Sequence, residues 1–246
     1  NLTTTFLISA LLFLISMLYS SVGHGGASGY LAILSFFAFS TNEMATTALL
    51  LNVFVAGTAF YFYKKAGHFS LSFTLPFILA SIPAAFIGGM LYIPHGMYHF
   101  LLAIALVFAA IRMIMSQKDK ANSINLSKYP TVLFSGAGIG LLSGIVGVGG
   151  GIFLSPLIIL MRWASIKETA ATASFFILVN SISGICGRYF RDGLEVGTLM
   201  PFVIAALIGG SIGSYTGSHR FSGLLLRKLL ALVLLTAAVK SVLRCF

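Results

Sequence analysis

The sequence predicts an all-α polytopic membrane protein built from two homologous repeats. Two observations lead to this fold class: the chain is unusually apolar, and one glycine-rich motif occurs twice within long apolar segments. Of its 246 residues, 58% are hydrophobic and 8% are charged, with a mean hydropathy of +1.02. Soluble domains carry about 25% charged residues, so this composition excludes an ordinary soluble domain.

Eight apolar runs follow one another along the chain, and most approach the ~20 residues that a helix needs to cross a bilayer. The runs cover residues 6–22, 44–63, 73–92, 100–115, 132–146, 170–185, 199–215 and 224–239. At least eight helices are therefore expected. The first run is predicted to be a transmembrane helix and not a signal peptide, because no basic segment precedes it. The alternating pattern of a membrane β-barrel is absent.

The net charge of +10 comes from 15 Lys and Arg residues against 5 Asp and Glu residues. On a soluble fold this excess would suggest nucleic acid as a partner. Here the basic residues cluster in short loops and at helix ends, as cytoplasmic anchoring requires. The sequence therefore predicts the lipid bilayer, and no nucleic acid, as a partner. The two cysteines are too few for a disulfide framework.

Internal duplication is visible in a glycine motif and in the residues that follow it. Residues 22–27, Val-Gly-His-Gly-Gly-Ala, return at 146–151 as Val-Gly-Val-Gly-Gly-Gly. The further matched pairs are Ser40 with Ser165, Glu43 with Glu168, Asn52 with Asn180, Pro76 with Pro201, and Gly88 with Gly209. The Ser-x-x-Glu pairs have the form of a capping box before an apolar helix. We place an N-terminal repeat at 1–127, including a polar linker at 117–127, and a C-terminal repeat at 128–246.

Each repeat opens with an apolar stretch that is too long for one crossing. Residues 132–163 would form about 48 Å of helix against a hydrocarbon core of ~30 Å. The glycine cluster is the expected break, because consecutive glycines weaken a helix and permit the positive φ angles of a sharp turn. Residues 29–39 and 152–163 then suit half-membrane helices. A Gly-rich broken or re-entrant helix is therefore predicted at the start of each repeat.

The orientation of the repeats has two alternatives. With four crossings in each half the repeats are parallel, and the better assignment places ten of the fifteen basic residues in the cytoplasm. With five crossings the repeats are inverted, the N-terminus lies outside, and eleven of fifteen basic residues are cytoplasmic. The positive-inside rule does not separate these counts. We favour inverted repeats, because paired broken helices usually accompany them in transporters.

The glycine clusters predict an anion-binding site near the bilayer midplane. A helix that begins within the membrane presents free N–H groups and the positive end of its dipole. The candidate substrate-binding residues are Gly23, His24, Gly25, Gly26, Asn52, Gly147, Gly149, Gly150, Gly151, Asn180 and Arg188. All five acidic residues fall in loops or at helix starts, which disfavours a cation as substrate. The structural alternative is that these glycines permit close helix packing.

Four candidate side chains each have a structural alternative. His24 stands where the second motif has Val148; it either donates to an oxyanion and titrates near neutral pH, or bonds to a turn carbonyl as a neutral ring. Asn52 and Asn180 either line the pathway or join helices. Arg188 either reaches into a vestibule or extends to the membrane interface.

Residues 146–156, Val-Gly-Val-Gly-Gly-Gly-Ile-Phe-Leu-Ser-Pro, and their weaker copy at 22–31 resemble the TauE/SafE permeases, also called the toluene-sulfonate uptake permease family. The resemblance covers nearly the whole chain. It implies a secondary transporter in the bacterial cytoplasmic membrane that moves sulfite, sulfonates, sulfoacetate or similar small anions. Substrate would bind between the repeats and reach either side by alternating access. His24 and Ala27 depart from the all-glycine form of the motif.

Other classes of protein remain as alternatives. Gly26-Ala-Ser28-Gly29 fits the G-x-S-G pattern of an intramembrane serine protease, although the duplicated position of Ser28 is Ile152. An anion channel is the third class. His95 and His99 are spaced for a metal, but Pro94 and Gly96 predict a loop there. No catalytic residue, metal or cofactor is expected, and the oligomeric state stays open, a homo-oligomer included.

Overall fold

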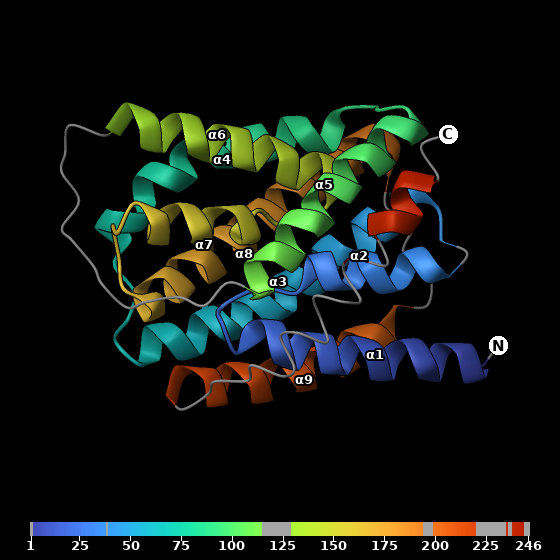
Figure 1. Cartoon of the computed structure of the whole chain (residues 1–246), viewed down its shortest axis with the longest axis horizontal. Coiled ribbons are helices and arrows are strands. Elements are labelled where there is room, and N and C mark those ends of the chain that lie inside the picture. The colour runs from blue at the N-terminus through green and yellow to red at the C-terminus, as the bar shows by residue number, and fades with distance from the viewer. Residues whose placement is uncertain are drawn as a thin grey trace.

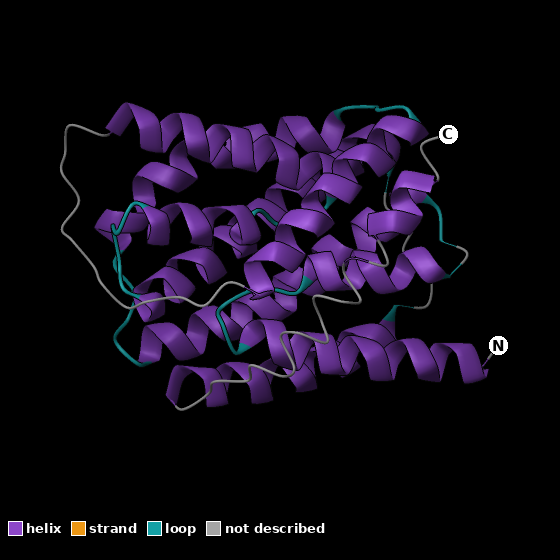
Figure 2. Ribbon diagram, in the orientation of Figure 1, coloured by secondary structure: helices purple, strands orange, loops and turns teal. Residues whose placement is uncertain are grey.

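The computed structural model describes residues 2–37, 39–114, 129–193, 199–219, 235 and 238–243, and the regular secondary structure of these residues is helical (Figures 1 and 2). Its main helices are α1 (Leu2–Ser20), α2 (Ala27–Phe36), α3 (Thr41–Lys65), α4 (Leu71–Met90), α5 (His95–Ile114), α6 (Tyr129–Val146), α7 (Gly151–Leu160), α8 (Ile166–Asp192) and α9 (Met200–His219). The predicted all-α class is confirmed.

Five of these helices are long and apolar enough to cross a membrane: α1, α3, α4, α8 and α9. Helices α2, α5 and α6 add shorter apolar segments. Large apolar side chains are exposed on the outside of the bundle, among them Phe6 at 76%, Leu79 at 61% and Phe134 at 80%. Exposed side chains of this kind suit a surface that faces lipid. Together with the five long apolar helices, they indicate a multi-pass membrane protein.

Helices α3 and α8 form the centre of the bundle and pack against each other. Within the most apolar 18-residue stretch of each helix, the buried share is 56% in α3 and 61% in α8, against 28% in α1 and 33% in α9. Both begin with the predicted capping box: Ser40 and Glu43 exchange hydrogen bonds at the start of α3, and Ser165 and Glu168 do so at α8. Each box satisfies N–H groups that a helix start would otherwise leave unpaired.

Close glycine contacts join the outer helices to one another. Helix α6 packs on α4 through Gly136, Gly140 and Gly144, and α9 packs on α1 through Gly209, Gly213 and Gly217. A Cβ atom at any of these six glycines would collide with a backbone carbonyl of the facing helix or, for Gly217, of Ser21 directly after α1. The four-residue spacing places each set of glycines on one helix face, where the small residues allow the backbones to approach.

The helix order relates the two halves of the chain. The first helix of each predicted repeat packs on the fourth helix of the other, α1 on α9 and α6 on α4. In Figure 1, α1 and α6 run in opposite directions, and each is followed by a short helix that turns back. This arrangement favours inverted over parallel repeats. The predicted boundary at residue 127 lies outside the described residues, so the duplication stays a prediction.

Two details differ from the sequence-based expectation. The prediction of a loop around Pro94 and Gly96 is wrong. Helix α5 begins at His95, so His95 and His99 both lie in its first turns. Proline is tolerated directly before a helix start, where its missing N–H has no intrahelical acceptor. Most of the apolar run at 224–239 lies outside the described residues.

Candidate functional site

The predicted breaks in the two long apolar segments are present, and each coincides with its glycine cluster. Helix α1 ends at Ser20 and α2 begins at Ala27, while α6 ends at Val146 and α7 begins at Gly151. The residues with positive φ angles in the two turns are Gly23 (75°), Gly26 (101°), Gly147 (85°), Gly149 (77°) and Gly150 (79°). Residues with a Cβ atom rarely adopt this region, so glycine is required by the turn itself.

Both return helices start without a side-chain cap. Gly26 and Gly150 occupy the N-cap positions of α2 and α7, and neither position has a side-chain hydrogen bond to the helix start. The first N–H groups of such helices have no intrahelical acceptor, and they carry the positive end of the helix dipole. Residues 23–35 and 146–152 are buried, so these donors lie inside the protein.

The two turns meet at one place, around Asn52 of α3 and Ile177 of α8. A Cβ atom at Gly25 would collide with the Asn52 carboxamide and lie 3.1 Å from Ile177 Cγ2. A Cβ atom at Gly149 would likewise collide with the Asn52 carboxamide and lie 2.9 Å from Ile177 Cγ2. The structure thus brings together the two glycine clusters and one of the two predicted asparagines.

Hydrogen-bonding capacity is left unused at this meeting point. Asn52 is fully buried and its Nδ2 donates to the carbonyl oxygen of Val148 at 3.4 Å, across the two halves of the chain. Its Oδ1 has no hydrogen-bond partner among the described residues, and neither has the buried Oγ of Ser181, next to Gly149. Buried polar atoms are nearly always paired, so these two indicate a place where a ligand or water completes the bonding.

His24 links the first turn to α7. Its Nδ1 lies 3.0 Å from the carbonyl oxygen of Val22, and its Nε2 lies 3.1 Å from Oγ of Ser155. The ring is 7% exposed. The carbonyl contact is the one expected for the structural reading of His24, whereas the contact with Ser155 joins the two halves and was not foreseen.

Asn180 is fully buried and bonds within its own helix. Its Nδ2 donates to the carbonyl oxygen of Phe176 on the same helix at 2.8 Å. Counted from the matched caps at Ser40 and Ser165, it is Ile177, and not Asn180, that occupies the position equivalent to Asn52. The structure therefore pairs Asn52 with an apolar residue at the turns.

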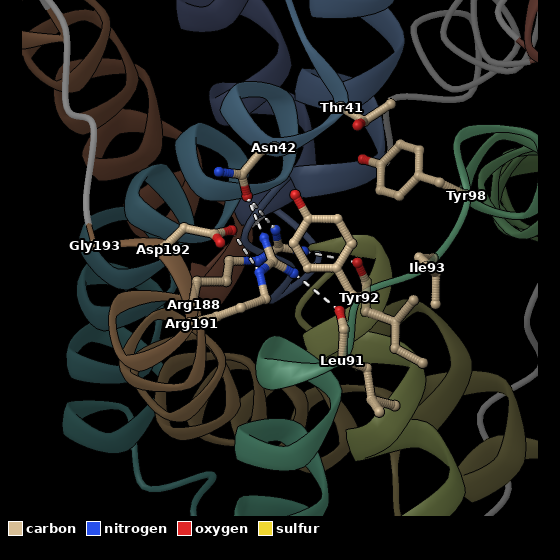
Figure 3. Close-up of a pocket in the computed structure, with 11 residues that line it drawn as sticks. Thr41, Asn42, Leu91, Tyr92, Ile93, Tyr98, Arg188, Arg191, Asp192 and Gly193 are labelled. Atoms are coloured by element: carbon tan, nitrogen blue, oxygen red, sulfur yellow. Dashed lines mark hydrogen bonds and ion pairs between the residues drawn. The ribbon is translucent and has the colours of Figure 1, made fainter.

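Arg188 is also separate from the turns, and it lines a cavity of about 290 Å³ (Figure 3). The polar lining residues include Thr41, Asn42, Tyr98, Arg188, Arg191 and Asp192. Arg188 is 3% exposed and donates from Nη2 to the carbonyl oxygens of Gly144 (3.0 Å) and Ile145 (2.7 Å). The expected extension to the membrane interface is therefore not seen, because this side chain turns inward to the end of α6.

Sequence reasoning did not select Asn42, Tyr98, Ser155 or Arg191. One signal was present for Arg191, which follows Arg188 by three residues and so shares its helix face. Ser155 lies within the second glycine motif, but its contact with His24 joins residues 131 apart in sequence. Tyr98, which donates to the carbonyl oxygen of Val146 at 3.2 Å, had no local signal.

The fold and these contacts define a class: a polytopic α-helical membrane protein in which two broken helices meet at a buried polar point. The family model for the sulfite exporter TauE/SafE matches residues 8–241. The chain belongs to the TauE/SafE family, which confirms the resemblance drawn from residues 22–31 and 146–156.

Two bacterial relatives match the chain over almost their whole length. A probable membrane transporter protein of Sinorhizobium fredii, y4hK, is 36% identical over 93% of this chain and 94% of its own length. The probable membrane transporter protein YdhB of Bacillus subtilis is 26% identical over 98% of this chain and 100% of its own. Sulfite exporter TauE/SafE family protein 2 of Arabidopsis thaliana is 35% identical over 30% of this chain and 16% of its own length. No solved structure matches. The chain is thus a membrane transporter of the TauE/SafE type.

Proposed function

We propose that this protein is a secondary transporter of small sulfur-containing or organic anions, such as sulfite, sulfonates and sulfoacetate, which bind between the two halves at the glycine turns. The observation that carries this proposal is the meeting of two uncapped helix starts around Asn52 in the buried core. Two positive dipole ends form a site for an anion without placing a formal charge in the membrane.

The acidic residues support an anion as cargo. Glu43 and Glu168 accept hydrogen bonds at the starts of α3 and α8, and Asp192 forms an ion pair with Arg191 at 2.6 Å. Asp119 and Glu195 lie outside the described residues. In the part of the chain that the structure describes, therefore, no carboxylate lies beside the turns to hold a cation.

Alternating access follows from how the turns are packed. Gly25 and Gly149 both lie directly against the Asn52 carboxamide, so an anion needs the two halves to separate at this point. The contacts of α1 with α9 and of α4 with α6, in which glycines bring the backbones close together, join the two halves and are where the halves would shift relative to one another. Rocking of one half against the other would open the turns to one side at a time.

The names of the relatives agree with this proposal. The matching family model is described as a sulfite exporter, and the two bacterial relatives are named as probable membrane transporters. The sulfur oxyanion named there is a small anion of the kind that uncapped helix starts bind.

Flux of radiolabelled sulfite, sulfonates and sulfoacetate in proteoliposomes tests the proposal. Gly150→Leu is expected to abolish flux, because a side chain at φ 79° is strained and would collide with Phe176. Gly138→Leu is the matched control, since nothing lies within 4 Å of a Cβ atom at that exposed glycine. Flux is expected to persist in the control.

A second variant separates a lost site from a lost fold. Asn52→Asp keeps the size of the side chain but adds a negative charge where the anion is proposed to bind, so we expect flux to fall at least tenfold while the protein stays folded. Unchanged flux in a folded Asn52→Asp protein would overturn the proposed site. Flux that never saturates and cannot be exchanged against internal anion would instead support a channel.

The protease alternative has a direct readout as well. Ser28 is 2% exposed, and its Oγ lies 2.8 Å from the hydroxyl of Tyr19, a group that is a poor base at neutral pH. Ser28→Ala is therefore expected to leave transport largely intact. Cleavage of a reporter substrate is expected to be the same in the variant and in the unaltered protein.

A further inference from the structure

A second polar centre lies away from the glycine turns, in the cavity lined by Arg188 and Arg191 at the C-terminal end of α8 (Figure 3). The cavity volume of about 290 Å³ is at the lower limit of ligand pockets, which suits a small molecule. Its walls come from the start of α3, the α4–α5 connection, the first turn of α5, the end of α6 and the end of α8.

Two guanidinium groups share one neutral acceptor in this cavity. Asn42 Oδ1 accepts from Arg188 Nη1 at 3.0 Å and from Arg191 Nη2 at 2.7 Å. Figure 3 shows the two arginine side chains side by side, with the Asn42 carboxamide between them and α3. Like charges this close raise each other's energy unless an anion lies between or beside them.

The charges of the lining residues do not balance. Asp192 is the acidic lining residue, and it is paired with Arg191 Nε at 2.6 Å. Arg188 is 3% exposed, its hydrogen bonds go to neutral oxygens, and its Nε has no partner in the described part of the chain. A buried, uncompensated guanidinium is costly, so an anionic ligand beside it is strongly favoured.

The start of α3 lies against the same cavity. Thr41 and Asn42 are the first residues of this 25-residue helix, and both line the cavity. The capping box satisfies the N–H groups of Ser40 and Glu43, whereas those of Thr41 and Asn42 have no intrahelical acceptor. The two arginines, with the unpaired Nε of Arg188, thus lie beside the start of α3 in one small space, while the Glu43 carboxylate in the first turn offsets part of the helix dipole.

We propose that this cavity is a vestibular binding site for an oxyanion, where substrate is held before it reaches the glycine turns. Its ligand is a compact oxyanion with a short organic group or none, such as sulfite or a short-chain sulfonate. The identity of the ligand rests on the proposed function, whereas the site itself rests on the arginine contacts.

The site is connected to the second glycine turn through the end of α6. Arg188 holds the carbonyls of Gly144 and Ile145, and Gly147 opens the turn two residues later. An anion at Arg188 competes with these carbonyls for the guanidinium, so binding in the vestibule loosens the helix end beside the proposed central site.

The vestibule lies at the same end of the bundle as the N-terminus, because α1 and α2 run in opposite directions and α3 begins beside the end of α2 (Figure 1). The assignment that places eleven of fifteen basic residues in the cytoplasm puts this end outside. The vestibule is therefore assigned to the external face of the membrane.

Asn42→Asp tests the site without weakening the fold. The new carboxylate would occupy the position between both guanidinium groups and compete with the ligand, while forming stronger bonds to them and suiting a helix start. We expect a tenfold or greater rise in the Kd of ethanesulfonate, measured by titration on the detergent-solubilised protein, together with an unchanged or higher melting temperature. Arg191→Gln is expected to weaken binding as well.

Lys65→Gln is the matched control, because it also lowers the net charge by one but lies at the other end of α3, exposed beside Tyr61. Its Kd is expected to stay within twofold of the unaltered protein. An Asn42→Asp protein that binds ethanesulfonate as tightly as the control would overturn the vestibular site.

Labelling of Thr41→Cys, in a Cys186→Ser and Cys245→Ser background, reports on the side of the membrane. A membrane-impermeant thiosulfonate added to intact cells is expected to label this position, and ethanesulfonate to protect it. Labelling that ethanesulfonate does not slow would contradict the assignment of ligand and site.

The two proposals fail in different ways. If ethanesulfonate binding weakens in Asn42→Asp but the unaltered protein shows no flux, the proposed transport is wrong and the vestibular site is supported. If saturable flux falls in Asn52→Asp, while neither flux nor ethanesulfonate binding changes in Asn42→Asp, the vestibular site is wrong and transport is supported.

Discussion

Asn52 and Ile177 both contact Gly25 and Gly149, so that one polar and one apolar side chain lie where the two glycine turns meet. Each residue stands at the same distance from its helix cap, at Ser40 or Ser165. The two halves thus supply equivalent positions with unlike chemistry: α3 places the Asn52 carboxamide there, whereas α8 places Ile177 there and adds the Ser181 hydroxyl beside Gly149.

Asn52→Leu is expected to destabilise the turns as well as to impair transport. It removes the donor to Val148 and leaves that buried carbonyl unpaired, which costs about 1–3 kcal/mol. Chemical unfolding in detergent measures the change. Thr58→Val is the control. It removes only the hydrogen bond from the Thr58 hydroxyl to the carbonyl oxygen of Val55 within α3, and it is expected to cost less. Equal losses for the two variants would show that the bond across the turns is unimportant.

His24 and Ser155 are expected to be energetically coupled, because their side chains lie 3.1 Å apart and join the first turn to α7. His24→Ala and Ser155→Ala should each lower stability, and the double variant should lose less than the sum by roughly 0.5–1.5 kcal/mol. Thermal or chemical unfolding of all four proteins completes the cycle. Additive losses would show that the pair does not interact.

The glycine face of α6 predicts a steep dependence of folding on side-chain size. Gly140→Val would drive a side chain into the backbone of Ser81 on α4, and Gly144→Val would do the same at Ala85. Overpacking of this kind costs typically 1–3 kcal/mol or more. The yield of monodisperse protein in detergent should fall for both variants and remain normal for Gly138→Val, which faces open space.

Tyr63 and Arg188 occupy equivalent positions after their caps, and each binds the end of the first helix of a half. Tyr63 donates to the carbonyl oxygen of Ser21 at 3.0 Å, whereas Arg188 binds Gly144 and Ile145. Tyr63→Phe is expected to cost about 1 kcal/mol of stability, the worth of one hydrogen bond, and to leave the Kd of ethanesulfonate unchanged. A raised Kd in Tyr63→Phe would show that both helix ends control the vestibule.

The two capping boxes should contribute equally. Ser40→Ala and Ser165→Ala each remove an acceptor for a helix N–H group, at a cost of about 0.5–2 kcal/mol. Comparison of their unfolding midpoints is the measurement. A much larger effect at Ser40 would indicate that the start of α3 also orders the vestibule through Asn42.

Local patterns in the sequence were sufficient to predict the helices, the helix caps and the helix breaks of this protein. Apolar runs of membrane length require helices, because backbone groups in lipid must bond within the segment. Ser-x-x-Glu specified the starts of α3 and α8, and consecutive glycines specified the turns after α1 and α6, since these effects act within a few residues of the chain. The family also followed from the glycine motifs.

Only the tertiary structure decided which residues share a site. The sequence paired Asn52 with Asn180, but helix packing places Asn52 and Ile177, which stand at equivalent positions after their caps, against the same two glycines, Gly25 and Gly149. It also grouped Arg188 with the turns, whereas the side chain points to the end of α6 and joins Arg191 and Asn42 in a separate cavity. Contacts between residues more than a hundred positions apart depend on helix rotation and crossing, and no local pattern encodes these.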